Sequence, residues 1–396
     1  METTSLELAV VGAGPVGLAL ALQAARALPA ARITVFDARP LDKDVSGDPR
    51  TLALSLGSVQ LLKRLGAWDG ARAQPIAEVH VSQAPPSLVL GLGEPEVRIR
   101  AVDEAVPMLG AVLSYGAVVA PLQRAWLDEA ARQPRRRQAR FGSAVQALKP
   151  LADGVEVDGG IAERFDLVVV AEGGVFAEQA RKALASPYHQ TAWVGQVTLS
   201  GGQPGVAFER FTRHGPVALL PLQPTDDGLL RAALVWCVPS ADDPVRELGD
   251  TQRLAVLNTI VPEAAGRLVG ISALKDFPLG LNAERTLVSG RTVRIGNAAQ
   301  TLHPVAGQGL NLGLRDAHEL VEALRKSPTI EAALRRLEWR RAPDRWSMIA
   351  ATDFLARSFT WKAPGLATAR GLGLAALQFA KPVKSLLARQ MMFGRR

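Results

Sequence analysis

A glycine pattern near the N-terminus, directly after the apolar residues 6–11, constrains the fold of this chain more than any other feature. Gly12, Gly14 and Gly17 have the spacing Gly-x-Gly-x-x-Gly. An Ala- and Leu-rich stretch and a second apolar run then lead to Asp37. In a strand–turn–helix–strand unit, such glycines permit the tight turn, the approach of a pyrophosphate and close helix packing, and the acid binds a ribose hydroxyl. The unit therefore predicts a Rossmann-like dinucleotide-binding domain.

A second glycine-rich loop is expected in the last third of the chain. It follows the apolar residues 292–295, which suit a buried strand, and it leads into a stretch with apolar residues at helical spacing. The loop contains Gly296, a turn at His303-Pro304 and the Gly-Gln-Gly sequence of residues 307–309. Backbone N–H groups in such a loop can approach a ligand, and the following helix N-terminus favours an anionic or electron-accepting group. The alternative is an ordinary connection within an α/β domain.

Length and composition indicate a globular protein with room for two or three domains. The chain has 396 residues, 48% of them hydrophobic, and no apolar run is long enough to span a bilayer. Cys237 is the only cysteine, so no disulfide framework points to an oxidising compartment. Glu2 and Glu7 stand where a signal peptide would carry basic residues. We therefore expect a cytoplasmic protein.

Positive charge is concentrated at the C-terminal end. The formal net charge is +8, and no acidic residue follows Asp353. The basic residues beyond this point are Arg357, Lys362, Arg370, Lys381, Lys384, Arg389, Arg395 and Arg396. Apolar residues alternate with them, which is typical of amphipathic helices that bind a protein partner or an anionic surface, here the inner face of the cytoplasmic membrane. The alternative is a helical cap with a solvated basic face. Nucleic acid is not expected, because no nucleic-acid module accompanies the charge.

Local patterns predict how the middle of the chain is built. Alternating apolar residues near 79–81, near 97–100 and between 193 and 238 predict antiparallel strands, unlike the parallel βα pattern before them. A loop is expected over residues 48–55 and a solvated arginine loop over 134–137. Helices are expected over 59–65 with a cap at Gly57-Ser58, over 121–131 and over 251–268.

These patterns predict a domain organisation in which one domain is interrupted by another. The nucleotide-binding domain is expected to comprise residues 1–75, 118–185 and 286–330. A substrate domain is expected from residues 76–117 and 186–285, and a helical, basic amphipathic segment from residues 331–396.

The order of the motifs resembles that of single-component flavoprotein aromatic hydroxylases, the group of para-hydroxybenzoate hydroxylase. The motifs are the Gly12-x-Gly14-x-x-Gly17 turn, the acid-glycine corner at Glu172-Gly173, and the loop from Gly296 to Asn311. Within this group the chain is most similar to the ubiquinone-biosynthesis hydroxylases, at residues 48–55, 208–212, 219–222, 277–279 and 296–304. Asn297, where an aspartate is more usual, is similar to the 2-polyprenyl-6-methoxyphenol hydroxylase branch.

The resemblance implies an α/β fold in which a Rossmann-like FAD-binding domain is interleaved with an antiparallel β-sheet substrate domain. It implies that Gly12, Gly14 and Gly17 hold the FAD pyrophosphate, Asp37 the adenosine ribose and Arg39 the adenine side. It places Arg50 and Gln123 at the flavin half, with Glu172, Gly296 and Asn297 near the ribityl chain and pyrophosphate. It places Gly307, Gln308, Gly309, Leu310 and Asn311 against the isoalloxazine. His303 and Pro304 would border the reaction chamber, and the stiff apolar segment around Pro221 could form a wall of the substrate pocket.

The resemblance also implies the chemistry. NAD(P)H reduces FAD, O₂ is captured as a flavin hydroperoxide, and one oxygen is transferred to a polyprenylated phenol of ubiquinone biosynthesis. The residues are compatible with this, because no second Gly-x-Gly-x-x-Gly unit indicates a separate nicotinamide domain. The five histidines are dispersed along the chain, so no metal site is expected.

Two departures from the family pattern leave alternatives open. Glu172 stands where the family usually has Asp, and the residues before Gln123, where relatives often contact the flavin through polar groups, are Val119, Ala120 and Pro121. One alternative is a catalytically idle flavin-binding scaffold subunit of a ubiquinone-biosynthesis complex. Another is a flavin reductase or dehydrogenase on the same fold.

Overall fold

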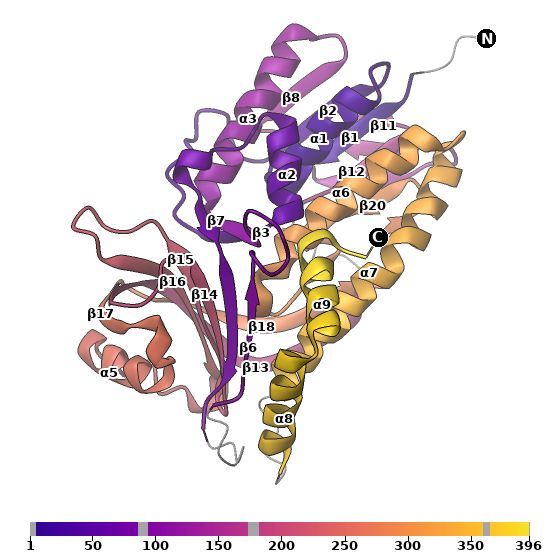
Figure 1. Ribbon diagram of the computed structural model, residues 1–396. Helices are drawn as coiled ribbons and strands as arrows, with labels where there is room; N and C mark the ends of the chain where they lie inside the picture. The colour runs from indigo at the N-terminus through magenta and orange to yellow at the C-terminus, as the bar shows by residue number, and fades with distance from the viewer. Residues whose placement is uncertain (1–4, 86–93, 173–181, 359–364, 396) are drawn as a thin grey trace.

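Figure 1 shows a computed structural model of the chain, which describes residues 5–85, 94–172, 182–358 and 365–395. Gly173 of the expected acid-glycine corner and residues 359–364 of the C-terminal segment lie outside the described residues.

A six-stranded sheet forms the first part of the molecule. Its order is β19-β20-β12-β1-β2-β8. The strands are β1 (Glu7–Val11), β2 (Arg32–Asp37), β8 (Arg137–Phe141), β12 (Leu167–Val170), β19 (Val288–Ser289) and β20 (Thr292–Arg294). All neighbours run parallel except β19 and β20. The predicted strand–turn–helix–strand unit is therefore confirmed, with β1 and β2 at the centre of a parallel sheet.

Helices cover one face of this sheet and a small sheet covers the other. The helices are α1 (Pro15–Ala27), α2 (Leu56–Leu65), α3 (Tyr115–Arg132) and α6 (Gln308–Lys326). They share the main hydrophobic core with Leu8 and Val10 of β1. The alternate residues Ala9 and Val11 pack against a three-stranded antiparallel sheet of β9 (Ala147–Pro150), β10 (Val155–Asp158) and β11 (Ala162–Phe165). The continuous apolar character of β1 follows from burial on both faces.

A nine-stranded sheet forms the second part of the molecule. Its strands are β5 (Glu78–Gln83), β6 (Glu96–Arg100), β13 (Lys182–Ser200), β14 (Val206–Thr212), β15 (Gly215–Leu222), β16 (Leu230–Pro239), β17 (Arg267–Ile271), β18 (Lys275–Glu284) and β21 (Gln300–Thr301). Most neighbours are antiparallel, but β14 and β5 run parallel. Chain segments on both sides of α3 thus build one sheet, as the interleaved α/β prediction requires.

Helix α5 (Asp250–Ile260) covers one face of the nine-stranded sheet, and the C-terminal helices lie on the other side (Figure 1). These are α7 (Ile330–Ser358), α8 (Leu366–Phe379) and α9 (Lys381–Phe393), so the expected helical C-terminal segment is observed within the described residues. A third small sheet of β3 (Thr51–Ser55), β7 (Gly110–Ser114) and β4 (Gln74–Ile76) lies beside α2. Within the described residues, no helix has both the length and the apolar character needed to cross a membrane.

Three local predictions around the first domain are wrong. Residues 51–55 of the expected loop form strand β3, because they pair with β7. Helix α2 starts at Leu56 with Ser55 as its N-cap, rather than after Gly57-Ser58. Helix α3 starts at Tyr115 rather than at Pro121, because the hydroxyl of Ser114 accepts a hydrogen bond from the Ala117 N–H group at 3.2 Å.

Two further predictions fail for reasons of packing and termination. Arg137, expected in a solvated loop, is 1% exposed, and its guanidinium donates to the backbone carbonyls of Ala31 and Ala25. Helix α5 ends at Ile260 instead of extending to 268, and Pro262 follows two residues later. The chain then forms β17, which pairs with β13.

Candidate active site

The three glycines of the N-terminal turn have different roles in the structure. Gly12 has a φ of +103°, and a Cβ there would lie 2.9 Å from the Cβ of Glu172. A Cβ at Gly17 would overlap the carbonyl oxygen of Gly12. Gly14 is different, because its nearest obstacle would be the Tyr115 hydroxyl at 3.6 Å. Gly12 and Gly17 are therefore required by packing, whereas Gly14 leaves space in front of α1.

The N-terminus of α1 lacks a side-chain cap. Gly14 is its N-cap residue and Pro15 its first residue, and no side chain of the N-cap accepts from the N–H groups of the first turn. An uncapped helix N-terminus behind a glycine is suited to a phosphate-bearing ligand. The donor set at this end of the sheet therefore fits the pyrophosphate of a dinucleotide.

Asp37 organises the residues beyond the turn. Its Oδ2 accepts a hydrogen bond from the Ala13 N–H group at 2.6 Å, and its Oδ1 accepts one from the Arg39 N–H group at 2.8 Å. The guanidinium of Arg39 donates to Oε1 of Gln123 at 3.0 Å. Arg39 and Gln123 therefore touch, although the resemblance assigns them to opposite halves of the cofactor.

The guanidinium of Arg50 packs on the ring of Tyr115. The guanidinium carbon of Arg50 lies 4.1 Å from the centre of the Tyr115 ring, and Arg50 pairs with Asp48 at 2.8 Å. Burial raises the pKa of the Tyr115 phenol, and the charge of Arg50 opposes that shift. Sequence reasoning missed Tyr115. The only signal is its rarity, since it is one of two tyrosines in the chain.

Glu172 follows β12 and lies next to Gly12. Burial raises the pKa of this carboxyl above its usual range, and the nearby charge of Asp37 raises it further. The protonated form is therefore favoured relative to an ordinary glutamate. Glu172, which is longer than the aspartate usual in the family, therefore lies beside the glycine turn after β12.

The second glycine-rich loop ends at another uncapped helix N-terminus. Gly307 is the N-cap of α6 in a left-handed conformation, with a φ of +59°, and no side chain caps the helix. A Cβ at Gly309 would meet nothing within 4 Å. The first turn of α6 therefore presents N–H groups and partial positive charge at an open position.

Helices α1 and α6 approach each other closely where both begin. A Cβ at Gly313 would lie 2.8 Å from Cα of Gly296 and 2.9 Å from Cγ2 of Val16. Gly296 itself has a φ of +59°. Asn297, which follows it, is exposed. Gly313 was not singled out from the sequence, because a helical glycine by itself carries no signal of a close crossing.

Asn311 connects α6 to the strand and helix beside it. Its Oδ1 accepts hydrogen bonds from the Ser55 N–H group and the Ser58 hydroxyl, both at 2.8 Å. Its Nδ2 donates to the carbonyls of Ala53 and Gly307, both at 3.0 Å. The side chain therefore holds the loop in place from behind, with its polar atoms bonded to protein groups. Its neighbours Gln308 and Leu310 are buried and half-buried, respectively.

His303 is buried, with 2% of its surface exposed, and neutral. Its Nδ1 accepts a hydrogen bond from the Val305 N–H group at 3.2 Å, so Nε2 carries the proton and donates to Oε1 of Gln190 at 3.0 Å. Tyr188 packs against the ring edge-to-face, with centroids 5.1 Å apart. Burial lowers the pKa of His303 to about 4. This arrangement positions the loop, in which Pro304 starts the short helical turn Val305–Gly307.

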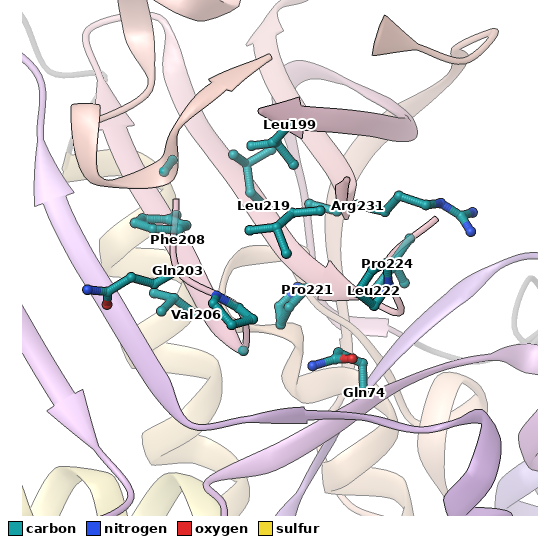
Figure 2. Close-up of a pocket in the computed structure, with 15 residues that line it drawn as sticks. Gln74, Leu199, Gln203, Val206, Phe208, Leu219, Pro221, Leu222, Pro224 and Arg231 are labelled. Atoms are coloured by element: carbon teal, nitrogen blue, oxygen red, sulfur yellow. The ribbon is translucent and has the colours of Figure 1, made fainter. Parts of the chain in front are cut away.

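Pro221 lines a small cavity on the α5 side of the nine-stranded sheet (Figure 2). Leu219, two residues earlier in β15, shares the hydrophobic cluster under α5, whereas Leu220 packs in the cluster with Leu56 and Ile76 on the other side. The cavity has a volume of about 30 Å³. The role of Pro221 in a substrate pocket stays a prediction.

Buried charges join α6 to α7. Asp316 accepts from Arg341 at 2.7 Å, and Arg341 also pairs with Asp344 at 2.6 Å. The pKa of Asp344 is lowered, because the charges of Arg341 and Arg315 outweigh the effect of its burial. These groups are paired and buried, so they link the two helices and do not form an open site. No group of three or more His, Cys, Asp or Glu residues suited to a metal occurs in the described ranges.

A family model described as an FAD binding domain matches residues 179–350. The chain is similar to the ubiquinone hydroxylase UbiL of Rhodospirillum rubrum, with 31% identity, covering 97% of this chain and 88% of the relative. It is similar to 3-demethoxyubiquinol 3-hydroxylase of Escherichia coli K12, with 30% identity and 97% of both chains covered. HpxO of Klebsiella pneumoniae, solved in complex with FAD, has a TM-score of 0.71 at 18% identity and covers 98% of this chain and 99% of its own. That likeness shows the fold.

Proposed function

The chain belongs to the ubiquinone-biosynthesis family of FAD-dependent hydroxylases, and from this membership we propose that it hydroxylates the ring of a polyprenylated phenol with NAD(P)H and O₂ as co-substrates. It is an FAD-dependent aromatic monooxygenase. The observation that carries the proposal is the meeting of α1 and α6, whose uncapped N-termini lie behind open glycine positions. One N-terminus suits a pyrophosphate and the other an electron-accepting ring.

In this proposal the two helices α1 and α6 bind different parts of the cofactor. The backbone around Gly14, between the strand ends that carry Asp37 and Glu172, would hold the FAD pyrophosphate. Gly307 and Gly309 would hold the isoalloxazine. When bound, FAD takes a hydride from NAD(P)H and activates O₂, so that one oxygen atom reaches the phenol.

The protein's own groups orient the loop and exclude water. Neutral His303 holds the backbone of Val305 on one side and Gln190 on the other, so we assign it a positioning role. Val305 packs against Phe211 of β14, and Tyr188 covers the His303 ring. An apolar wall of this kind keeps water from the reacting atoms, which favours oxygen transfer over wasteful release.

We also propose that the protein works at the inner face of the cytoplasmic membrane. A polyprenylated substrate resides in lipid, and the segment after Asp353 contains basic residues and no acidic ones. A ubiquinone-biosynthesis complex that binds this segment is the alternative partner.

A measurement of flavin reduction distinguishes the proposed hydroxylase from the two alternatives, an idle scaffold and a reductase or dehydrogenase. We expect anaerobic NADPH or NADH to bleach the absorbance of the FAD-loaded protein, and a short-chain prenylphenol to accelerate the reduction. An idle scaffold would keep oxidised FAD with both nicotinamides and with several phenols. A reductase or dehydrogenase would be reduced but would return no hydroxylated phenol when O₂ is admitted.

A further inference from the structure

An unusually apolar surface lies on the outer face of α8 and α9. Its large side chains are Leu372 (53% exposed), Phe379 (80%), Val383 (50%), Leu386 (66%) and Leu387 (41%). In α8 these residues are seven positions apart, and in α9 they are three or four apart, so each set lies on one face of its helix. Ala369 and Ala376, also exposed, extend the same face of α8. We call these seven residues the outer stripe.

The opposite face of the two helices is attached to the body of the protein. Gln378 accepts from the backbone N–H group of Arg98 at 3.0 Å, and Lys384 donates to the Arg98 carbonyl at 3.0 Å. These bonds cover the edge strand β6, which would otherwise present free backbone groups. Ala388 and Met392 of α9 are buried. The outer stripe is therefore a surface that the fold holds in place, because α8 and α9 lie beside β6 (Figure 1).

The charges around the outer stripe favour an anionic lipid surface over a second copy of this chain. Lys381 and Arg389 are exposed on α9, and no acidic residue occurs between residues 354 and 396. Arg370 lies on the inner side of α8, where it donates to the Ser358 carbonyl. Nε of Arg389 lies 3.6 Å from Oε2 of Glu104, so the body of the protein balances part of the positive charge of α9. Two copies meeting through this face would bring like charges together around an apolar contact, whereas anionic headgroups would complement them.

The position of α8 relates this surface to the active site. Leu374, on the inner side of α8, packs against Phe211 and Val305, and Val305 belongs to the loop that His303 positions. On its outer side, α8 carries Leu372 and Phe379. A helix with its side chains is about 10 Å across. The loop thus lies about one helix diameter behind the outer stripe.

We propose that the outer stripe inserts into an anionic bilayer and that α8 thereby holds the active-site loop next to the lipid that contains the substrate. This inference rests on the proposed function for the identity of the substrate. It adds which face of the protein contacts lipid and which helix lies between lipid and loop. The ring of a prenylated phenol then reaches the site while its chain remains in lipid.

Vesicle binding by matched variants tests the proposal. The test variant is Phe379→Ser/Leu386→Ser, and the control is Val102→Ser/Ile161→Ser, which removes two side chains that are 78% and 75% exposed elsewhere. With vesicles of phosphatidylcholine and phosphatidylglycerol at low salt, we expect the test variant to bind at least about tenfold more weakly than the parent. The control should bind like the parent, and vesicles of phosphatidylcholine alone should bind the parent more weakly.

Equal binding of the test variant and the parent would overturn the proposal, as would a parent that does not bind anionic vesicles. We expect sedimentation without vesicles to show no parent dimer that is lost in the test variant. Such a dimer would mean that a second copy of the chain, and not lipid, covers the outer stripe. FAD content and turnover of a soluble short-chain phenol should match in all three proteins. If none of them hydroxylates that phenol, the proposed function is wrong. The vesicle result still shows whether the outer stripe binds an anionic bilayer.

Discussion

At the scale of single residues, the active-site loop depends on a histidine that does not ionise. The hydrogen bonds to Nδ1 and from Nε2 of His303 require the neutral ring, and burial lowers its pKa to about 4. A group with this pKa and both nitrogens bonded is a poor acid or base near neutral pH. The prediction that His303 lies beside the flavin and borders the reaction chamber remains a proposal.

We predict that His303 makes the protein sensitive to acid. Its folded pKa of about 4 lies below the unfolded value of 6.5, so the unfolded chain binds the extra proton between these values. The stabilising effect of the neutral ring is complete above pH 6.5 and is lost as the pH falls towards 4, by about 3 kcal/mol. Denaturant unfolding at several pH values should show this loss in the parent. In His303→Asn, which keeps an acceptor near Nδ1, the loss should be much smaller. The same acid slope in both proteins would refute the assignment.

At the scale of elements, α6 combines cofactor binding with structural support. Its first turn presents open N–H groups, Gly313 allows it to touch α1, and Asp316 anchors it to α7. Asn311 connects the same helix to β3 and α2 through side-chain hydrogen bonds. The helix therefore couples the geometry of the loop to the packing of the whole first domain.

Asn311→Leu should expose this coupling. The substitution leaves the Ser55 N–H group and the carbonyls of Ala53 and Gly307 without their partner, and we expect a loss of about 2–4 kcal/mol in the free energy of unfolding. The FAD content after purification should also fall. As a control, Asn258→Leu removes a comparable pair of backbone hydrogen bonds between α5 and β17, far from the loop. Asn258→Leu should keep its FAD, and equal FAD loss in both variants would argue against a specific role for Asn311.

At the scale of the whole molecule, the sequence predicts the architecture well, because hydrophobic periodicity and glycine turns report local burial. The parallel unit around β1 and the antiparallel strands β13 to β16 follow from these patterns. What the sequence does not reveal depends on partners that are distant along the chain. Strand β3 exists because β7 pairs with it, and Arg137 is buried because carbonyls of α1 and the following loop surround it.

The candidate site likewise contains residues that the sequence predicts and residues that it does not. The glycines and Asp37 could be predicted, since each satisfies a local backbone requirement of a dinucleotide turn. Tyr115 and Gly313 could not, because their positions follow from the packing of α3 and α6 against α1. The contact between Arg39 and Gln123 likewise joins residues that are 84 positions apart in the chain, one after β2 and the other within α3.

The most direct test of the central claim is the origin of the oxygen atom in the product. The FAD-loaded protein is mixed with NADPH or NADH and a prenylphenol under ¹⁸O₂, and the products are analysed by mass spectrometry. Gly14→Val is the matched control, because the position is open in the fold but faces the proposed pyrophosphate, so the variant should fold without FAD. We predict a hydroxylated phenol that carries one ¹⁸O atom, formed by the parent and absent with Gly14→Val. Nicotinamide oxidation without labelled product, or labelled product with both proteins, would contradict the account.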